Sequence, residues 1–219
     1  MTTTGQMCYH KTMKFLALTL LLALASCASV LPAPDYRNVA KLWRADGGYG
    51  TAFPVAYAAD GFYALTCWHV VNGADEDMSL DLDGVVYPGG VVIWTDEDAD
   101  VALVGFKTTD RPWLYQLALV QPEAYTAGTV AGYPLGIEFL HVSPVLFQSS
   151  RNIVHGLTGP GGSGGPVFDQ SGKVVGIVSR IRTPQVQTGF GAGRTLMGWI
   201  VEMRLLDTAR EKLAELNAR

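Results

Sequence analysis

Residues 159–167 read Gly-Pro-Gly-Gly-Ser-Gly-Gly-Pro-Val, so five glycines surround a single serine, Ser163. Glycine permits backbone conformations and close backbone approaches that a side chain would prevent. A loop of this composition can aim successive backbone N–H groups at one point, which is what an oxyanion hole requires. A merely flexible loop would not explain why one hydroxyl is bracketed in this way. The stretch is therefore interpreted as a loop that carries a nucleophile.

A second motif contains a histidine. Leu65-Thr66-Cys67-Trp68-His69-Val70-Val71 places His69 at the end of a strand-like run, just before the turn residues Asn72-Gly73. A side chain at the end of a strand can project from a rigid edge. An isolated histidine is more often structural, so this motif indicates catalysis only in combination with the other two motifs.

A third motif contains four acidic residues, Asp96, Glu97, Asp98 and Asp100, directly before the apolar run Val101–Val104. The first three are interpreted as a solvated turn. Asp100 differs because it stands where the strand becomes buried, and a buried carboxylate without a hydrogen-bond donor is costly. An imidazole N–H is a suitable donor for it.

Together the three motifs resemble those of the chymotrypsin-like (trypsin-fold) serine proteases, and more closely the HtrA-like bacterial branch. Leu65–Val71 matches T-x-x-H-V-V, Asp100–Leu103 matches D-x-A-L, and Gly161–Pro166 matches G-x-S-G-G-P. The chain order His, Asp, Ser is that of chymotrypsin and differs from subtilisin and the α/β-hydrolases. The resemblance spans about residues 47–206.

The resemblance implies a role for each motif residue. Ser163 would attack the scissile carbonyl, and His69 would act as its general base and then as the acid for the leaving amine. Asp100 would hold the tautomer of His69 and stabilise the imidazolium. The backbone N–H groups of Gly161 and Ser163 would form the oxyanion hole.

The same resemblance implies a substrate-binding strand. Ser179, Arg180 and Ile181 would pair with the substrate backbone. Leu157 lies six residues before Ser163, where trypsin-like members carry a pocket acid. Because leucine gives no reason to expect cleavage after Lys or Arg, we expect a small or aliphatic P1 residue.

Short β-branched or aromatic runs, separated by Gly, Asp and Pro, fill the body of the chain. Many short strands with frequent turns are typical of sandwiches and barrels. The resemblance implies an all-β fold of two six-stranded antiparallel β-barrels with a C-terminal α-helix. The predicted strands are Thr51–Tyr57, Gly61–Thr66, Gly84–Tyr87, Val91–Thr95, Val101–Lys107, Thr129–Gly132, Pro144–Gln148, Pro166–Phe168 and Lys173–Arg180.

The C-terminal helix is predicted from one apolar stripe at helical spacing. We expect it to pack on the second half of the body, with no PDZ-like domain after it. The stripe comprises Trp199, Met203, Leu206, Ala209, Leu213 and Leu216. The predicted order along the chain is a signal peptide (1–26), a tether (27–38), an N-terminal barrel (39–115), a C-terminal barrel (116–197) and the helix (198–219).

The first segment is interpreted as a targeting signal. Two lysines precede the apolar run Phe15–Ala25, whose eleven residues are too few to span ~30 Å of hydrocarbon. The following Leu24-Ala25-Ser26-Cys27 resembles the lipobox of bacterial lipoproteins, in which cleavage leaves an acylated Cys27 as the N-terminus. The alternative is an ordinary signal peptide cut near Ala25 or Ala28, with Cys27 incidental.

The net charge and the number of cysteines exclude some classes of partner and cofactor. The 219 residues carry a net charge of −4 without a long basic run, which argues against nucleic acid. Three cysteines cannot form a disulfide framework, and no metal or cofactor is expected. The expected partners are a protein or peptide substrate and a membrane, through lipid on Cys27. Ala28, rather than Asp, after the cysteine favours the outer membrane, so the predicted location is the bacterial cell envelope, facing the periplasm.

The predicted function is a membrane-anchored serine endopeptidase that works through a His-Asp-Ser triad and an acyl-enzyme intermediate. One alternative is an envelope peptide-binding or chaperone lipoprotein on the same fold, for which catalysis is dispensable. An esterase with the same triad is another. The presence of His69, Asp100 and Ser163 together argues against a pure binder, which needs none of them.

Overall fold

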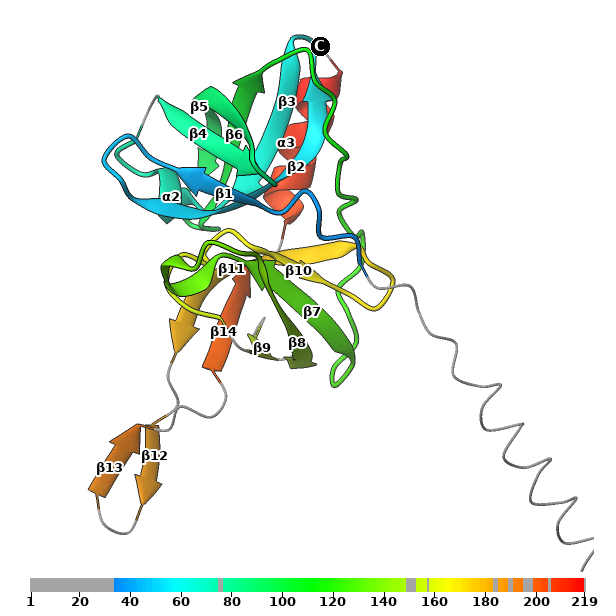
Figure 1. The fold of residues 1–219 in the computed structure, drawn as a ribbon. Helices are drawn as coiled ribbons and strands as arrows, with labels where there is room; N and C mark the ends of the chain where they lie inside the picture. The colour runs from blue at the N-terminus through cyan, green and yellow to red at the C-terminus, as the bar shows by residue number, and fades with distance from the viewer. Residues whose placement is uncertain are drawn as a thin grey trace, which may run out of the picture. The chain divides into compact units, whose positions relative to one another are not determined.

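The computed structural model describes residues 34–74, 77–148, 153–156, 158–182, 185–188, 191–194, 199–204 and 206–218. The predicted signal peptide, the lipidation site Cys27 and the pocket position Leu157 lie outside these residues. Within them the fold is mostly β, with two six-stranded sheets and a helix near the C-terminus (Figure 1). None of the helices in these ranges is long and apolar enough to cross a membrane.

The first sheet comes from the N-terminal half. All its neighbouring strands pair antiparallel, in the order β1-β2-β3-β6-β5-β4, and β4 pairs back to β1. A single helical turn, α2 (Trp68–Val71), follows β3. The strands are β1 (Ala40–Trp43), β2 (Tyr49–Ala58), β3 (Gly61–Thr66), β4 (Met78–Leu82), β5 (Val85–Asp96) and β6 (Val101–Lys107).

The second sheet is a closed barrel with the order β10-β11-β14-β9-β8-β7. A two-stranded hairpin of β12 (Gln185–Thr188) and β13 (Gly191–Arg194) lies between β11 and β14 in the chain. The barrel strands are β7 (Ala127–Gly132), β8 (His141–Gln148), β9 (Ile153–Gly156), β10 (Pro166–Phe168), β11 (Val174–Arg182) and β14 (Trp199–Arg204), with a short 3₁₀ turn, η1 (Pro134–Gly136), between β7 and β8.

The alternation of side chains along the strands explains how the first sheet buries one of its faces. In β4, Met78, Leu80 and Leu82 are buried, whereas Ser79 and Asp81 between them are half-exposed. Strands alternate their side chains between two faces, so this pattern gives one face to the core. Large side chains that are fully buried fill that core: Leu42, Phe53, Phe62, Leu65, Leu80, Leu103 and Phe106.

One long strand replaces two predicted ones. Gly84–Tyr87 and Val91–Thr95 were expected as separate strands, but β5 continues through both. Pro88-Gly89-Gly90 is the bend at which β5 leaves β4 and joins β6. A Cβ on Gly90 would come within 2.5 Å of the Phe106 ring, so glycine is required where the strand crosses the core. The glycine pair is therefore a bend within a strand and not a break.

The C-terminal helix is confirmed, but its predicted start is wrong, and it packs on the first half as well as on the second. Trp199–Arg204 is the strand β14, paired with β9 and β11, and the helix α3 covers only Asp207–Asn217. The β-branched pair Ile200-Val201 suits a strand, and its pairing closes the second barrel. The apolar stripe counted from Trp199 therefore joined two different elements.

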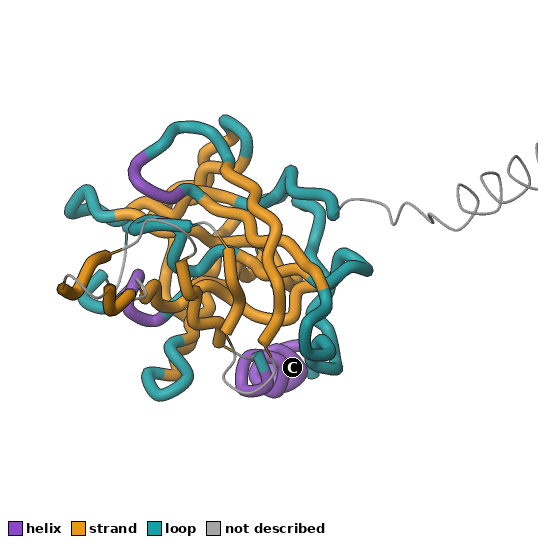
Figure 2. The backbone as a smooth tube through the Cα atoms, turned by 90° about the horizontal axis from the view of Figure 1, so that it is seen from below, coloured by secondary structure: helices purple, strands orange, loops and turns teal. Residues whose placement is uncertain are grey.

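The helix packs against the first half and also contacts the second, because Arg210 of α3 donates to the carbonyl of Ala118. Leu206, Ala209 and Leu213 are buried in the same core as the N-terminal strands, and α3 contacts β6. Figure 1 draws α3 in red at the C-terminal end of the colour scale, and Figure 2 shows it at the edge of the strands, next to the C-terminus. The chain thus returns to its first half after completing the second.

Candidate active site

His69 lies in α2, immediately after β3. The strand ends at buried Thr66, whose hydroxyl donates to the carbonyl of Thr51 at 2.8 Å. Cys67 is fully buried and extended, and the chain then turns, so the His69 side chain is 41% exposed. The histidine therefore projects from the turn after the strand and not from the strand itself.

Asp100 is buried, as the sequence led us to expect, and its carboxylate is fully engaged. The residue is 3% exposed. Its two oxygens accept from His69 Nδ1 at 3.0 and 2.9 Å, and Oδ1 also accepts from the backbone N–H of His69 at 3.1 Å. The hydroxyl of Ser179 donates to Oδ2. The predicted imidazole donor is present, and the serine donor is one that the sequence did not indicate.

The surroundings of Asp100 act on its pKa in opposite directions. Burial raises the pKa of Asp100, but the hydrogen bonds from His69 and Ser179 outweigh this and hold it below the usual value of 3.8. The carboxylate is therefore ionised at neutral pH. With Nδ1 donating to that carboxylate, Nε2 of His69 is left as the proton acceptor.

The Ser163 loop is held by its backbone against the start of β2 and lies close to the end of β3. The N–H of Thr51 donates to the carbonyl of Ser163 at 2.8 Å. Gly164 has a φ of 84°, and a Cβ there would come within 2.1 Å of the Thr51 carbonyl oxygen and 2.3 Å of Thr66 Oγ1. Only glycine lets the loop approach Thr51 and Thr66 so closely. Thr66 directly precedes the segment that carries His69.

Two adjacent residues of β11, Val178 and Ser179, connect all three segments. The carbonyl of Val178 accepts from the N–H of Gly164 at 2.8 Å and from the Sγ of Cys67 at 3.0 Å. The next residue, Ser179, binds Asp100. The structure thus joins His69 to Asp100 directly and brings the Ser163 loop to the same two residues of β11.

The loop also presents backbone N–H groups at the predicted positions. The carbonyl of Pro160 accepts from Leu135 at 2.6 Å, and that of Gly162 accepts from Gly165 at 3.0 Å. In a planar trans peptide the N–H points opposite to its carbonyl, so both bonds orient the N–H groups of Gly161 and Ser163. In the parts of the chain that the structure describes, neither N–H donates to a protein acceptor.

The predicted substrate-binding residues lie along β11. The pairing of β10 with β11 ends at Ile177, so this edge of β11 is unpaired by β10 from Ser179 onward. The backbone of Ile181 continues the strand. Exposed Arg180 and buried Ser179 line a surface cavity of about 440 Å³ together with Trp68, His69, Glu97, Asp98 and Asp100.

Cys67, His69 and Asp100 also place possible metal ligands within 4.8 Å of one another. The Cys67 sulfur is already bonded to the Val178 carbonyl, and the Asp100 oxygens are bonded to His69 and Ser179. A carboxylate that accepts from an imidazole and a hydroxyl suits a proton relay better than a metal centre.

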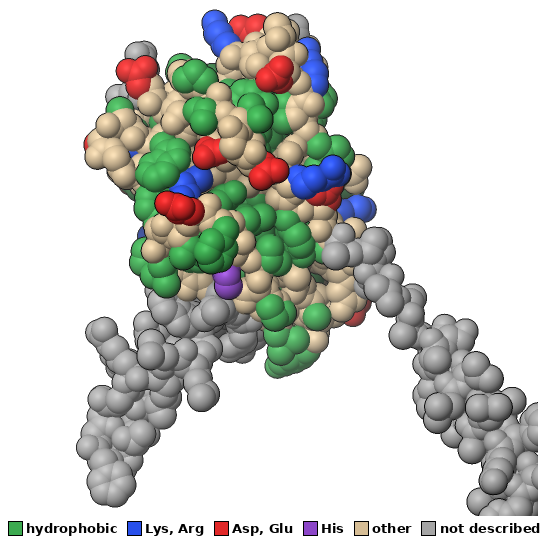
Figure 3. All heavy atoms as spheres, viewed as in Figure 1, with side chains coloured by type: hydrophobic (Ala, Val, Ile, Leu, Met, Phe, Trp, Pro, Cys, Tyr) green, Lys and Arg blue, Asp and Glu red, His purple; other side chains and the backbone are tan. Residues whose placement is uncertain are grey.

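The surface charge of the molecule is mixed. On the face of the molecule in Figure 3, acidic and basic side chains are interspersed among hydrophobic ones, and no single sign of charge dominates.

Comparison with known proteins agrees with this geometry. Residues 50–177, which contain His69, Asp100 and Ser163, match the model of the trypsin-like peptidase domain. The chain is 31% identical over 131 residues to "Probable periplasmic serine endoprotease DegP-like" of Hahella chejuensis, covering 55% of this chain and 28% of that protein. It is 30% identical over 167 residues to the protein of that name in Pseudomonas fulva, covering 67% and 34%. The chain thus spans about a third of the length of these curated relatives.

Solved structures show the same fold. The serine endoprotease from Yersinia pestis has a TM-score of 0.61 and 18% identity, covering 82% of this chain and 62% of that one. The inactive form of the Rv3671c protease of M. tuberculosis also has a TM-score of 0.61, with 19% identity, covering 85% and 98%. With its family model matched over most of the described body, the chain belongs to the trypsin-like peptidase domain family and is similar to its DegP-like bacterial members.

Proposed function

We propose that this protein is a serine endopeptidase that hydrolyses peptide bonds through Ser163, His69 and Asp100. The observation that carries the proposal is the hydrogen bond from His69 Nδ1 to the buried carboxylate of Asp100, beside a glycine-rich loop that carries Ser163. The family supports a serine protease, and these three residues supply the groups that such chemistry requires. Residues 39–115 would be the first barrel of this double-barrel fold, and the second would run from residue 116 through β14, past the predicted end at residue 197.

The first step is acylation. Ser163 Oγ attacks the scissile carbonyl carbon while His69 Nε2 takes its proton, which makes the C–O bond of a tetrahedral intermediate. The imidazolium then protonates the leaving amine as the C–N bond breaks, which leaves an ester on Ser163. Water, activated by His69, hydrolyses this acyl-enzyme. Asp100 stays ionised throughout, because its pKa lies below its usual value, and it stabilises the imidazolium.

The oxyanion would be bound by the N–H groups of Gly161 and Ser163. Their peptide orientations are set by hydrogen bonds to the Pro160 and Gly162 carbonyls. Preorganised donors of this kind contribute about 10²–10³-fold to turnover. Ser179, Arg180 and Ile181 would pair with the substrate through the edge of β11 that β10 leaves unpaired, and we expect a small or aliphatic P1 residue.

Active-site labelling tests this proposal. The protein should react with a fluorophosphonate probe and cleave casein, and Ser163→Ala should lose both. Ser171→Ala is a matched control, because that exposed hydroxyl bonds only within the turn at Asp169. Equal labelling of wild type and Ser163→Ala would rule the peptidase out. Full biological function in Ser163→Ala would favour the alternative peptide-binding or chaperone role.

The anchoring of the protein is a separate proposal. We infer that residues 1–26 form a lipoprotein signal peptide and that Cys27 carries lipid at the start of a tether to residue 38, with the protein in the outer membrane facing the periplasm. The sequence before Cys27 supports this, and the DegP-like relatives are named as periplasmic. Labelled palmitate should be incorporated into the wild type and not into Cys27→Ser; equal incorporation would contradict the assignment.

A further inference from the structure

Lys41 of β1 is buried in the middle of the fold. It is 7% exposed, and its ammonium lies over the rings of Trp43, Tyr49 and Tyr133, at 5.0, 5.5 and 5.2 Å from their centroids. Its Nζ donates to the carbonyl of Ile137 at 3.1 Å. Within the described ranges, no carboxylate lies within ion-pair distance of it. A strongly hydrated ammonium is costly to bury, so its few contacts point to a specific role.

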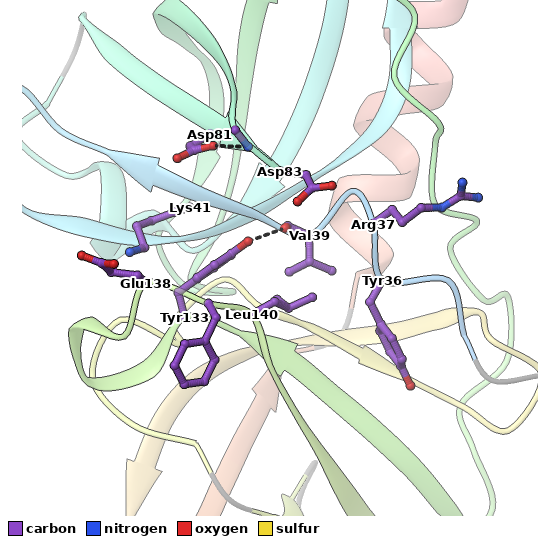
Figure 4. Close-up of a pocket in the computed structure, with 11 residues that line it drawn as sticks. Tyr36, Arg37, Val39, Lys41, Asp81, Asp83, Tyr133, Glu138 and Leu140 are labelled. Carbon is purple, nitrogen blue, oxygen red and sulfur yellow. Dashed lines mark hydrogen bonds between the residues drawn. The ribbon is translucent and has the colours of Figure 1, made fainter.

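The cavity next to Lys41 shows where it acts. This cavity, of about 580 Å³, lies between β1, the β4–β5 turn and the segment after Tyr133 (Figure 4). Tyr133 spans the two halves, because its hydroxyl donates to the carbonyl of Val39 in the first half at 3.2 Å. Asp81, Asp83 and Glu138 also line the cavity. Lys41 thus reaches from the first half to the middle of the β7–β8 connection, at Ile137.

That connection contains a backbone conformation that its own residues do not favour. Leu135 has a φ of 58° and Gly136 a φ of 74°. A left-handed leucine is strained, and Leu135 is 67% exposed, so burial of its side chain does not hold it there. Ile137, whose carbonyl Lys41 binds, closes the turn by donating to Pro134 at 3.3 Å. Lys41 therefore binds the turn at the residue that completes it.

The strained residue, Leu135, contacts the Ser163 loop. The N–H of Leu135 donates to the carbonyl of Pro160 at 2.6 Å. Because the peptide is planar and trans, this bond fixes the direction of the N–H of Gly161. Tyr49, over whose ring the ammonium lies, packs on the same peptide, since a Cβ on Gly161 would come within 2.4 Å of its ring.

Thr51 provides a second connection between the same segments. Its hydroxyl accepts from the N–H of Tyr133 at 3.1 Å and donates to the carbonyl of Gly161 at 2.9 Å. The hydroxyl thus links the residue before η1 to the loop itself. Two side chains of the first half, Lys41 and Thr51, therefore hold both the turn and the loop of the second half.

We propose that Lys41 is a positioning residue for the oxyanion hole: through Ile137 and the left-handed Leu135 it keeps the Pro160–Gly161 peptide turned so that the Gly161 N–H faces the substrate. The inference rests on the proposed peptidase function. Without the ammonium, the turn can relax from its strained conformation, the Leu135–Pro160 hydrogen bond is lost and the Gly161 N–H is no longer aimed. Lys41 itself does not touch the reacting atoms.

The test compares Lys41→Met, which keeps the length of the side chain and removes the ammonium, with Lys107→Met, whose lysine is 87% exposed. For Lys41→Met we expect kcat to fall ~10–100-fold, a partial loss of what one oxyanion donor supplies, with KM changed less than about threefold. The inhibition constant of a peptide boronic acid should rise by the same factor as kcat/KM falls, whereas the affinity for a product peptide should not change. Lys107→Met should match the wild type in every measurement.

Rescue separates positioning from general stability. Glycine adopts the left-handed conformation without strain, so adding Leu135→Gly to Lys41→Met should recover most of the lost kcat. Lys41→Arg keeps a cation over the rings and should recover part of it. If Lys41→Met does not fold, Lys41→Gln, which keeps an N–H donor, takes its place. The same two measurements are then compared: the inhibition constant of the boronic acid and the affinity for the product peptide.

The outcomes are distinguishable. An unchanged kcat in a folded Lys41 variant, or equal losses of boronic acid and product-peptide affinity, would overturn the inference and leave the peptidase proposal intact. A wild type that does not react with fluorophosphonate would instead refute the peptidase proposal, and this inference with it.

Discussion

The two halves of the molecule contribute to the candidate site in different ways. The first half contributes side chains, because His69 and Asp100 are joined through an imidazole and a carboxylate. The second half contributes mostly backbone, because the Ser163 loop is held through the carbonyls and N–H groups of its glycines and their neighbours. The side chains that the second half adds are the Ser163 hydroxyl and that of Ser179, which reaches Asp100. The first contribution is therefore sensitive to changes in polar groups, and the second to added volume.

The largest effect is expected where the side-chain contribution is removed. Asp100→Asn keeps the shape but replaces an oxygen that accepts from His69 with an amide donor, which favours the wrong tautomer of the imidazole. We expect kcat to fall about 10⁴-fold, or ~5.5 kcal/mol of transition-state stabilisation, with KM little changed. Steady-state kinetics measure this. Asp60→Asn, at a surface carboxylate, is the control, and an equal loss in both variants would contradict the proposed relay.

A smaller effect, on stability, is expected where the backbone contribution is disturbed. Gly164→Ala would force a Cβ against the Thr51 carbonyl at 2.1 Å, at a φ of 84°. Overpacking and a left-handed alanine together should lower the free energy of unfolding by about 3–5 kcal/mol in denaturant titrations.

Gly172→Ala isolates the conformational part of that loss. Its φ is 79°, but its nearest atoms lie 3.7 Å or more from the added Cβ, so only about 1 kcal/mol should be lost. If both alanine variants lost the same amount, close approach would not be what requires glycine at Gly164.

A smaller effect than at Gly164 is expected at the hydroxyl of Ser179, which reaches from the second half to Asp100. Ser179→Ala removes a donor that lowers the pKa of Asp100, so that pKa should rise toward its usual value. A carboxyl group whose pKa is lowered in the folded state stabilises the protein at pH values above ~3.9, its pKa in the unfolded state. This stabilisation is lost as the pH falls through the folded-state pKa. Ser179→Ala should therefore unfold about 1–2 kcal/mol more easily at pH 7 than the wild type. The difference should shrink in titrations at pH 3; a difference independent of pH would place its origin elsewhere.

Local sequence predicted the strands whose composition is uniform. The bounds of β3, β6 and β10 agree with the predictions, because continuous apolar runs there end at turn residues. The strands β1 and β4 were missed, because Lys41 and Asp81 interrupt short apolar runs. Lys41 is buried, so its place in the strand depends on the rings around it, whereas Asp81 is half-exposed on the polar face of β4.

The candidate site was predictable in its motifs and not in its supports. The sequence indicated that Asp100 needs a donor and that glycines around Ser163 allow close approach, and the structure contains both. The donor Ser179, the acceptor Val178 and the left-handed Leu135 have no local signal. Each depends on residues far away in the chain that only the folded arrangement brings near.

The junction at Val178 and Ser179 bears on when the site forms. The Cys67–Val178 and Asp100–Ser179 bonds join residues that are 111 and 79 positions apart, and such distant contacts close late because long loops must first be ordered. A newly made chain in which β11 has not docked therefore contains His69, Asp100 and Ser163 without the contacts that unite them. Proteolytic capacity would then arise only with the finished fold, so that an immature molecule could not digest its neighbours or itself.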